Sequence, residues 1–162
     1  MSLDFRQAKI GDLSHIVRML ADDFLGARRE RFEEPLPEGY VKAFRQIDAD
    51  PNNELIVAVL SEPHAGEPPA VQVVVGTMQI TFTPSISFQG GKRATVESVR
   101  IDRRYRGQGI GREMMLWAIE RAKREGCISM QLTTNVGRTD AHRFYENLGF
   151  SKTHLGMKLN LK

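Results

Sequence analysis

Three glycines at alternate positions, Gly107, Gly109 and Gly111, lie where a predicted strand passes into a predicted helix. Glycine lets the backbone turn and approach a ligand closely, because it has no side chain. The free amides at a helix start converge on one point, and the helix dipole favours an anion there. The sequence therefore predicts a diphosphate site. No Lys-Ser or Lys-Thr pair follows the glycines, which excludes a Walker loop, and their spacing differs from the dinucleotide-binding fingerprint.

The charge around these glycines also favours a ligand that carries phosphate. The segment from Lys92 to Arg112 holds seven lysines and arginines against two acidic residues, a local charge of +5 in a chain whose net charge is +3. Concentrated positive charge is typical of sites for nucleic acids and for phosphorylated cofactors. A solvated surface gives the same pattern, so the charge alone does not separate these alternatives.

The elements that must position this turn alternate between strands and helices in one domain, residues 1–162. A chain of 162 residues with 41% hydrophobic content suits a single compact core. Hydrophobic periodicity and the glycine and proline positions predict the elements. They predict strands at 3–9, 54–60, 71–83 (with a bulge at Gly76), 94–102 and 128–133, two short strands around Gly156 within 151–161, and helices at 11–24, 40–47, 109–124 and 140–147.

Composition restricts the setting of the protein. Its apolar runs are far shorter than a membrane span, and its first residues lack the pattern of a secretion signal. The one cysteine, Cys127, has no partner for an internal disulfide and reads as a small core residue. A reducing cytoplasm fits this usage, so we expect a cytoplasmic protein without membrane association and without a metal site.

The stretch from Arg106 to Gly111 resembles the signature of the GNAT superfamily of acyl-coenzyme A-dependent N-acyltransferases. That signature is Arg or Gln, two residues, Gly, one residue, then Gly or Ala, and this chain matches each fixed position. A second stretch, Ala141–Phe150, is similar to the family's C-terminal motif, in which a helix carries Phe-Tyr and ends at Gly-Phe. The opening, with Arg6-Gln7-Ala8 and then Gly11-Asp12-Leu13, is also similar. The resemblance covers nearly the whole chain and is loose between Ala27 and Ala70.

The resemblance implies an α/β (α+β) fold of the GNAT type. This is a mixed, mostly antiparallel sheet of six or seven strands flanked by about four helices, with a splayed cofactor gap between the fourth and fifth strands. It also implies transfer of the acetyl group of acetyl-CoA, a co-substrate, directly to a primary amine of a small molecule or a protein lysine. A homodimer is compatible with it.

Site residues follow from the resemblance position by position. Backbone groups at Val99 and Ile101 would pair with the pantetheine arm, Asn135 would contact the cofactor, and the Tyr145 hydroxyl would face the thioester sulfur. Amides from about Gln108 to Arg112 would hold the diphosphate, with outer contacts from Arg103, Arg104 and Arg106. The expected cofactor-binding set in the glycine turn is Arg106, Gly107, Gln108, Gly109, Ile110, Gly111 and Arg112.

The base that deprotonates the amine is expected to be Glu97, since several family members use an acidic residue on this strand. Glu97 lies two residues before Val99, and regular strand alternation would place both side chains on one face. The alternative is an exposed or ion-paired strand glutamate. Tyr145 has its own alternative, a core aromatic. His142 and His154 are weaker candidates for the base, and His142 is expected at the surface.

Two other functions remain open at this point. A non-catalytic acyl-CoA-binding regulatory module would keep the same glycine turn without the chemistry. A nucleic-acid-binding protein would use the basic segment, but no zinc, RNP-like or arginine-glycine motif accompanies it, so we expect no nucleic-acid partner. The acceptor is not identified. Acidic residues outnumber basic ones between Asp22 and Tyr40, which mildly favours a cationic acceptor.

Overall fold

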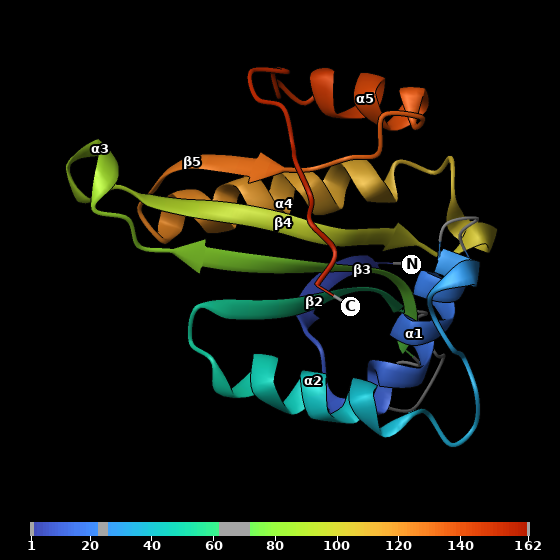
Figure 1. The fold of residues 1–162 in the computed structure, drawn as a ribbon. Helices are drawn as coiled ribbons and strands as arrows, with labels where there is room; N and C mark the ends of the chain where they lie inside the picture. Colours follow the sequence, from blue (N-terminus) through green and yellow to red (C-terminus); the bar gives the residue numbers. More distant parts are fainter. Residues whose placement is uncertain (1, 23–25, 62–71, 162) are drawn as a thin grey trace.

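The computed structural model of the protein describes residues 2–22, 26–61 and 72–161. Its sheet has five strands in the order β1-β2-β3-β4-β5 (Figure 1). Neighbouring strands are antiparallel, except that β4 and β5 are parallel because a helix connects them. The strands are β1 (Ser2–Gln7), β2 (Asn53–Ser61), β3 (Gln72–Thr83), β4 (Lys92–Ile101) and β5 (Cys127–Leu132).

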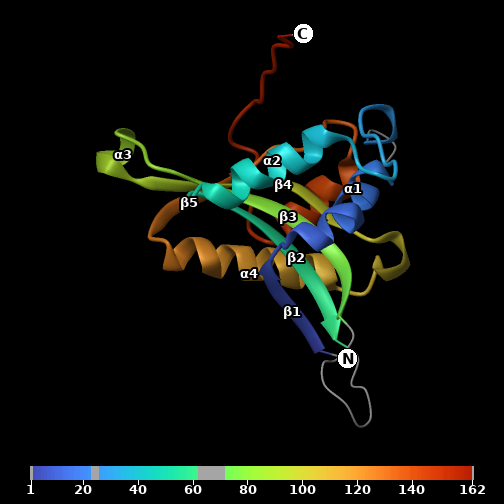
Figure 2. The ribbon, with the colours of Figure 1, turned by 90° about the horizontal axis from the view of Figure 1, so that it is seen from below.

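Helices cover both faces of the sheet (Figure 2). α1 (Leu13–Ala21) and α2 (Glu38–Ala49) lie on one face, and α4 (Ile110–Arg124) lies on the other. α5 (Thr139–Glu146) follows β5. Short turns complete the order of elements: η1 (Ile10–Asp12), η2 (Gly26–Arg28), α3 (Ser87–Gly90) and η3 (Arg103–Tyr105).

Two apolar cores result, one on each face of the sheet. α1 and α2 bury residues such as Val17 and Phe44 against Val57 of β2. α4 buries Met114 and Met115 against the opposite face, where the apolar side chains of β3 and β4 project. Burial of large apolar side chains on both faces fixes the strand register, because a one-residue slip would expose every one of them.

The predicted elements are largely confirmed, with small shifts at their ends. The predicted bulge at Gly76 is confirmed next to that glycine, because the β2–β3 register passes from Ala58 opposite Gly76 to Val59 opposite Val74, leaving Val75 unmatched. A Cβ on Gly76 would lie 2.8 Å from Ile101 Cδ1 and 3.2 Å from the Arg100 carbonyl oxygen, so a larger residue would require these groups to shift. The first helix was predicted at 11–24, and α1 ends at Ala21. The predicted last residue, Phe24, lies outside the described residues.

The expected strand count is wrong for the described residues. Five strands are present in place of six or seven, and five helices, counting the single turn α3, in place of about four. The missing strands are the two expected around Gly156, since residues 151–161 adopt no regular structure and are exposed. Their alternating pattern is real, but a strand forms only where another strand offers its backbone, and no strand of the described residues pairs with this segment.

Within residues 2–22, 26–61 and 72–161, no helix combines the length and the apolar character needed to cross a bilayer. The same residues contain no cluster of three or more histidine, cysteine or acidic side chains that could hold a metal ion.

Candidate active site

β4 and β5 separate part-way along their length. Their parallel ladder runs from Lys92 opposite Cys127 to Val96 opposite Leu132, where β5 ends. β4 continues to Ile101, still paired with β3 on its other edge. The edge of β4 from Glu97 to Ile101 therefore has no strand beside it among the described residues. This is where the sequence placed a gap between the fourth and fifth strands.

A β-bulge lies in this unpaired part of β4. Glu97 pairs with Gln79 and Arg100 with Thr77, so Ser98 and Val99 together face the single residue between them on β3. Ser98 has φ +55°, a left-handed conformation that is uncommon for a residue other than glycine. A bulge bends a strand and changes which face its side chains point to.

The bulge corrects the expected orientation of Glu97. Val96 lies in the α4 core, and Val99 and Ile101 pack against that same core, so the buried positions change from even to odd numbers across the bulge. Glu97 alternates with Val96 and therefore lies on the opposite face from Val99. The prediction that Glu97 and Val99 share a face is wrong, because it assumed a regular strand. Glu97 is exposed, on the face that carries α1 and α2.

The glycine turn has the backbone that its sequence predicts. Gly107 and Gly109 have φ of +75° and +82°, and Gly109 is the residue that precedes α4. No atom lies within 4 Å of a Cβ placed on either glycine, so conformation rather than crowding requires glycine here. The Arg112 amide donates to the Gly109 carbonyl at 2.9 Å, which leaves the amides before it as the donors without a helical partner. Arg112 was expected to offer its amide to the diphosphate, and that amide is used within the helix.

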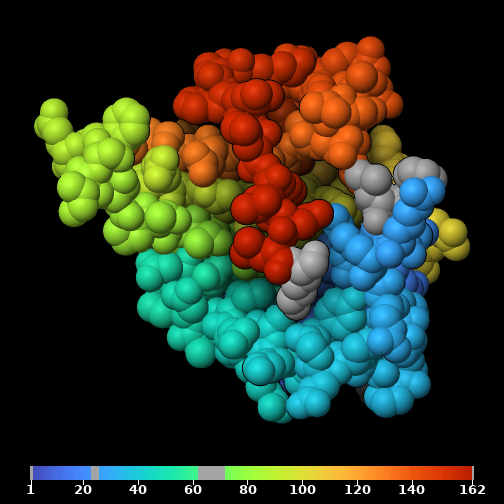
Figure 3. All heavy atoms as spheres, in the orientation of Figure 1, coloured from blue at the N-terminus to red at the C-terminus, as the bar shows by residue number. Residues whose placement is uncertain are grey.

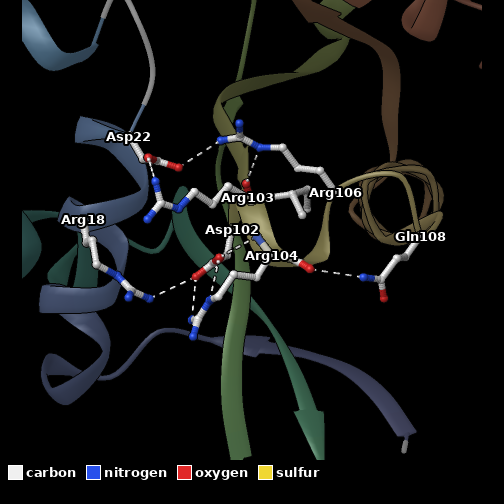
Figure 4. Close-up of polar contacts among 8 residues, drawn as sticks. Arg18, Asp22, Asp102, Arg103, Arg104, Arg106 and Gln108 are labelled. Carbon is white, nitrogen blue, oxygen red and sulfur yellow. Dashed lines mark hydrogen bonds and ion pairs between the residues drawn. The ribbon is translucent and has the colours of Figure 1, made fainter.

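The arginines before the glycine turn contact carboxylates of other elements (Figure 4). Arg106 donates to the Ile101 carbonyl at 3.0 Å and to Asp22 at 3.4 Å, and Arg103 lies 3.8 Å from the other Asp22 oxygen. Asp22 directly follows α1, so these contacts join the turn to that helix. Gln108 also donates inward, to the Arg104 carbonyl at 3.2 Å. These arginine side chains were predicted to contact the outer phosphates, and in this structure they bind protein groups.

Asp102 is the buried anchor of the turn, and the sequence analysis did not select it. Only 5% of the residue is exposed. Its carboxylate accepts from the Arg104 amide and side chain at 2.9–3.1 Å and from Arg18 of α1 at 3.0 Å. The hydrogen bonds from Arg104 lower the pKa of Asp102 to about 2, against the opposing effect of burial. An aspartate two residues before an arginine, at the end of a strand, was the available signal.

α5 brings Tyr145 to the same region. The Tyr145 ring packs edge-on against Phe144 and Phe150, with centroids 5.1 and 5.8 Å away. Phe144 also reaches the glycine turn, since a Cβ on Gly111 would lie 3.7 Å from its ring and 3.6 Å from Ile101. These are ordinary contact distances, so α5, the end of β4 and the start of α4 meet around Gly111.

The electrostatic setting of Tyr145 keeps its hydroxyl protonated. Burial raises the pKa of Tyr145, and the nearby charges of Arg100 and Arg138 oppose that rise without cancelling it. Arg100 lies on β4 directly after the bulge, and Arg138 immediately precedes α5. Tyr145 is thus a phenol at neutral pH, on α5 and close to Arg100 of the bulged strand.

Asn135 lies in the connection between β5 and α5. Its side-chain oxygen accepts from the Gly137 amide at 2.9 Å, and its carbonyl accepts from the Arg138 amide and lies 3.0 Å from His142 Nε2. In this structure Asn135 shapes the loop that leads to Tyr145. His142 is half-buried, and its Nε2 is hydrogen-bonded to this loop.

The arrangement can be compared with known proteins. The model of the Acetyltransferase (GNAT) family matches residues 21–150. The chain belongs to the GNAT family. Its sheet, the separation of β4 from β5 and its glycine turn agree with that assignment. The resemblance noted at Arg106–Gly111 and Ala141–Phe150 is confirmed.

Three relatives give finer comparisons. The chain is 45% identical over 49 residues to an aminoalkylphosphonate N-acetyltransferase of Salmonella typhimurium, covering 30% of this chain and 32% of that protein. It is 28% identical over 88 residues to a glucosamine 6-phosphate N-acetyltransferase of Trypanosoma brucei brucei, covering 54% of this chain and 58% of that protein. The chain thus spans about a third of one curated relative and under three fifths of the other. A solved structure described as a transcriptional regulator from Bacillus halodurans C-125 is 51% identical with a TM-score of 0.88, covering 99% of this chain and 100% of that one.

Proposed function

We propose that this GNAT protein is an N-acetyltransferase that uses acetyl-CoA as co-substrate and acetylates a primary amine directly. One observation carries the proposal: the opening between β4 and β5 meets the glycine turn at one end and Tyr145 beside it. The family uses acetyl-CoA, and two curated relatives are N-acetyltransferases. In this proposal, amides from Gln108 to Gly111 bind the diphosphate, and Val99 and Ile101 line the path of the pantetheine arm.

The residues present fit that ligand by their chemistry. The turn offers amides at a helix start, with glycine at the two left-handed positions, which suits an anion. The unpaired edge of β4 suits an extended chain with amide groups, because no neighbouring strand uses its backbone groups. The Val99 and Ile101 carbonyls on this strand accept from the Arg100 and Arg106 side chains, which a ligand chain would have to displace or accommodate.

The chemistry follows from what acyl transfer requires. The acceptor amine, with a reference pKa of about 10.4, must lose a proton before its nitrogen attacks the thioester carbonyl. A backbone amide at the bulge would donate to the oxyanion that forms. The carbon–sulfur bond then breaks, and Tyr145 would donate its hydroxyl proton, or a hydrogen bond, to the departing sulfur. The nitrogen, positively charged after its attack, would lose a proton to water, and a proton from water would restore the Tyr145 hydroxyl. Its raised pKa keeps that proton available at neutral pH. Glu97, exposed on the other face, would take the proton of the amine directly or through water.

The acceptor proposed first is a small primary amine that carries a phosphonate or phosphate group. Both curated relatives are described by such amines, an aminoalkylphosphonate and glucosamine 6-phosphate. A cationic acceptor is less favoured by the structure than by the sequence, because Asp22, Glu30 and Glu33 each contact an arginine side chain. Their charge is thus partly neutralised within the protein. Arg93 and Arg100 of β4 lie on the same face as Glu97 and would attract an anionic group.

The test is a thiol-release assay with acetyl-CoA over a panel of amines. The panel contains aminoalkylphosphonates, amino sugar phosphates, the same amines without phosphorus, polyamines and a lysine peptide. We expect turnover with the phosphorus-bearing amines to be higher than with the same amines without phosphorus. Turnover confined to amines without phosphorus would contradict the proposed anionic acceptor but support the N-acetyltransferase activity. Acetyl-CoA binding without turnover on any amine would contradict both proposals.

The alternative of a non-catalytic regulatory module has one observation in its favour: the description of the 51% identical structure as a transcriptional regulator. The two functions differ in what binding produces. A regulatory module binds acetyl-CoA and leaves the thioester intact in the presence of any amine, and mass spectrometry of the recovered cofactor distinguishes the two.

A further inference from the structure

Arg93 of β4 is a half-buried cation that no carboxylate neutralises in the part of the chain that the structure describes. Its Nε atom is buried and has no hydrogen-bond partner among those residues. The adjacent Lys92, by contrast, pairs with Glu125 at 3.3 Å. A buried donor without a partner costs free energy, and a bound acceptor removes that cost. Arg93 is therefore a candidate for binding an anion.

Small polar side chains surround Arg93 on its face of the sheet. Ala94 and Val96 project into the α4 core, so Arg93 projects to the opposite face. It lies opposite Thr83 of β3 and Ser129 of β5, and residues directly opposite one another in a ladder share a face. Both of these hydroxyl residues are exposed. Because a hydroxyl can donate a hydrogen bond, the two strands add donors on either side of the guanidinium.

The face that carries Arg93 leads along β4 to the proposed reacting centre. Thr95 and Glu97 follow Arg93 at alternate positions, so all three side chains project to the face that carries α1 and α2. The Thr95 hydroxyl accepts from Gln131 of β5 at 3.2 Å. Figure 3 shows this face in front, and the part of the sheet between α3 and the C-terminal segment is open to view there. A molecule that lies on this face can contact Arg93 at one end and the bulge after Glu97 at the other.

The separation of Arg93 and Glu97 sets the length of such a molecule. A strand rises about 3.3 Å per residue and its side chains stand roughly perpendicular to the sheet, so the two charged groups are about 13 Å apart. A charge-assisted hydrogen bond at each end takes up about 3 Å, which leaves about 7 Å between the amine nitrogen and an anionic oxygen. Bonds of about 1.5 Å cover that span only if at least about five follow one another. An amine two carbons from its phosphorus is too short, whereas an amino sugar phosphate, with the ring between the two groups, is long enough.

We propose that Arg93, with the hydroxyls of Thr83 and Ser129, binds the phosphate of the acceptor and favours acceptors in which a spacer of sugar-ring length separates amine and phosphate. This inference rests on the proposed acetyl transfer and narrows its acceptor class to amino sugar phosphates and amines of similar length. Arg100, directly after the bulge, donates to the Val99 carbonyl at 2.8 Å. It is the arginine closer to the reacting centre, so a short aminoalkylphosphonate would contact Arg100 and leave Arg93 without a partner.

The first test varies the spacer in the thiol-release assay with acetyl-CoA. Glucosamine 6-phosphate and glucosamine differ only in the phosphate, and ω-aminoalkylphosphonates with two to six carbons differ only in length. We expect kcat/KM to be higher for the six-carbon phosphonate than for the two-carbon one, and higher for glucosamine 6-phosphate than for glucosamine. A preference for the two-carbon phosphonate would overturn the proposal.

The second test removes the charge of Arg93. Arg93→Gln should raise the KM for the long phosphorus-bearing acceptors by about tenfold to a hundredfold, the usual contribution of a hydrogen bond to a charged group. The KM for glucosamine and for acetyl-CoA should stay near the parent values, and Arg93→Lys should restore part of the loss. The matched control Lys92→Gln removes a charge one residue away on the opposite face, where Glu125 keeps its ion pair with Arg121. The control should keep the parent KM for every acceptor.

The outcomes separate this inference from the proposed function. A parent-like KM for the long acceptors in Arg93→Gln would overturn the role of Arg93, and so would an equal rise for glucosamine, which indicates a general loss of structure. In both cases thiol release by the parent protein would still support the N-acetyltransferase. Absence of thiol release with every amine would contradict the proposed function and this inference with it.

Discussion

Tyr145 lies among aromatic rings and near two arginine charges. Its ring and its hydroxyl therefore have different surroundings, and they can have different roles in packing and in chemistry. Both Phe144 and Phe150 contact its ring, so the ring itself supports the fold. Its hydroxyl has no hydrogen-bond partner among the described residues, which leaves it free to face a ligand. The ring and the hydroxyl can therefore be tested apart.

Tyr145→Phe should keep the fold and the affinity for coenzyme A while lowering turnover by about 10²-fold, the usual contribution of a positioned acid. Steady-state thiol release and a thermal shift with coenzyme A measure the two effects. The matched control is Phe144→Tyr, which adds a hydroxyl one residue away and should not restore activity in Tyr145→Phe. Parent-like turnover in Tyr145→Phe would leave Tyr145 as a core aromatic.

Glu97→Gln keeps the shape of the side chain and removes its ability to accept a proton. If Glu97 accepts the proton of the amine, turnover should fall most at low pH and recover in part as pH rises, since more amine is then already neutral. A pH–rate profile from pH 6 to 10 measures this. An equal loss at every pH would indicate that Glu97 positions the acceptor by charge, and an unchanged profile would remove it from the mechanism.

At the scale of elements, the glycine turn depends on backbone conformation. Gly109 is left-handed, whereas Gly39 lies in the first turn of α2 with open space around its Cα. A residue other than glycine in the left-handed region costs about 1–2 kcal/mol, and Ala in place of Gly inside a helix stabilises by about 0.5–1 kcal/mol.

Gly109→Ala should therefore lower the free energy of unfolding and abolish the thermal shift given by acetyl-CoA, because the amides of the turn no longer converge. Gly39→Ala, the same chemical change, should raise the free energy of unfolding and keep the thermal shift. Differential scanning fluorimetry with and without acetyl-CoA measures both variants. An undiminished shift in Gly109→Ala would mean that the diphosphate binds elsewhere.

The elements were predictable where the sequence carries local signals, and less so where contacts between distant residues decide. The glycines at 107 and 109 and the apolar face of α4 are local, and both are confirmed. The face of Glu97 was mispredicted because Ser98 gives no sign of its left-handed backbone. Asp102 was missed because its burial depends on Arg18, 84 residues earlier in the chain. The roles of Tyr145 and Asn135 in binding stay predictions.

At the scale of the whole molecule, acid stability depends on carboxylates with lowered pKa values. The pKa of Asp102 falls from 3.8 to about 2 in the folded protein, so its contribution is complete above pH 4 and is lost as pH falls towards 2. A shift of this size corresponds to about 2 kcal/mol. Asp102→Asn should cost that much at pH 7, and the difference from the parent should shrink below pH 4.

Urea unfolding from pH 7 to pH 2.5 measures that difference. The matched control is Asp140→Asn, because the Asp140 side chain is 91% exposed and pairs with the exposed Arg143. An exposed pair of this kind contributes about 0–1 kcal/mol, so the control should differ little from the parent. A difference for Asp102→Asn that stays constant down to pH 2.5 would contradict the lowered pKa.

The ladder between β1 and β2 sets an order of events during synthesis. Gln7 pairs with Ile56 and Ser2 with Ser61, whereas β2 pairs with β3, the strand that follows it. Ribosomes add about 5–20 residues per second, so β1 waits some 3–10 s for its partner strand. Contacts between residues far apart in sequence also form more slowly. We expect β1 to dock onto a β2–β3 pair that has already formed, as the last strand of its edge rather than the first.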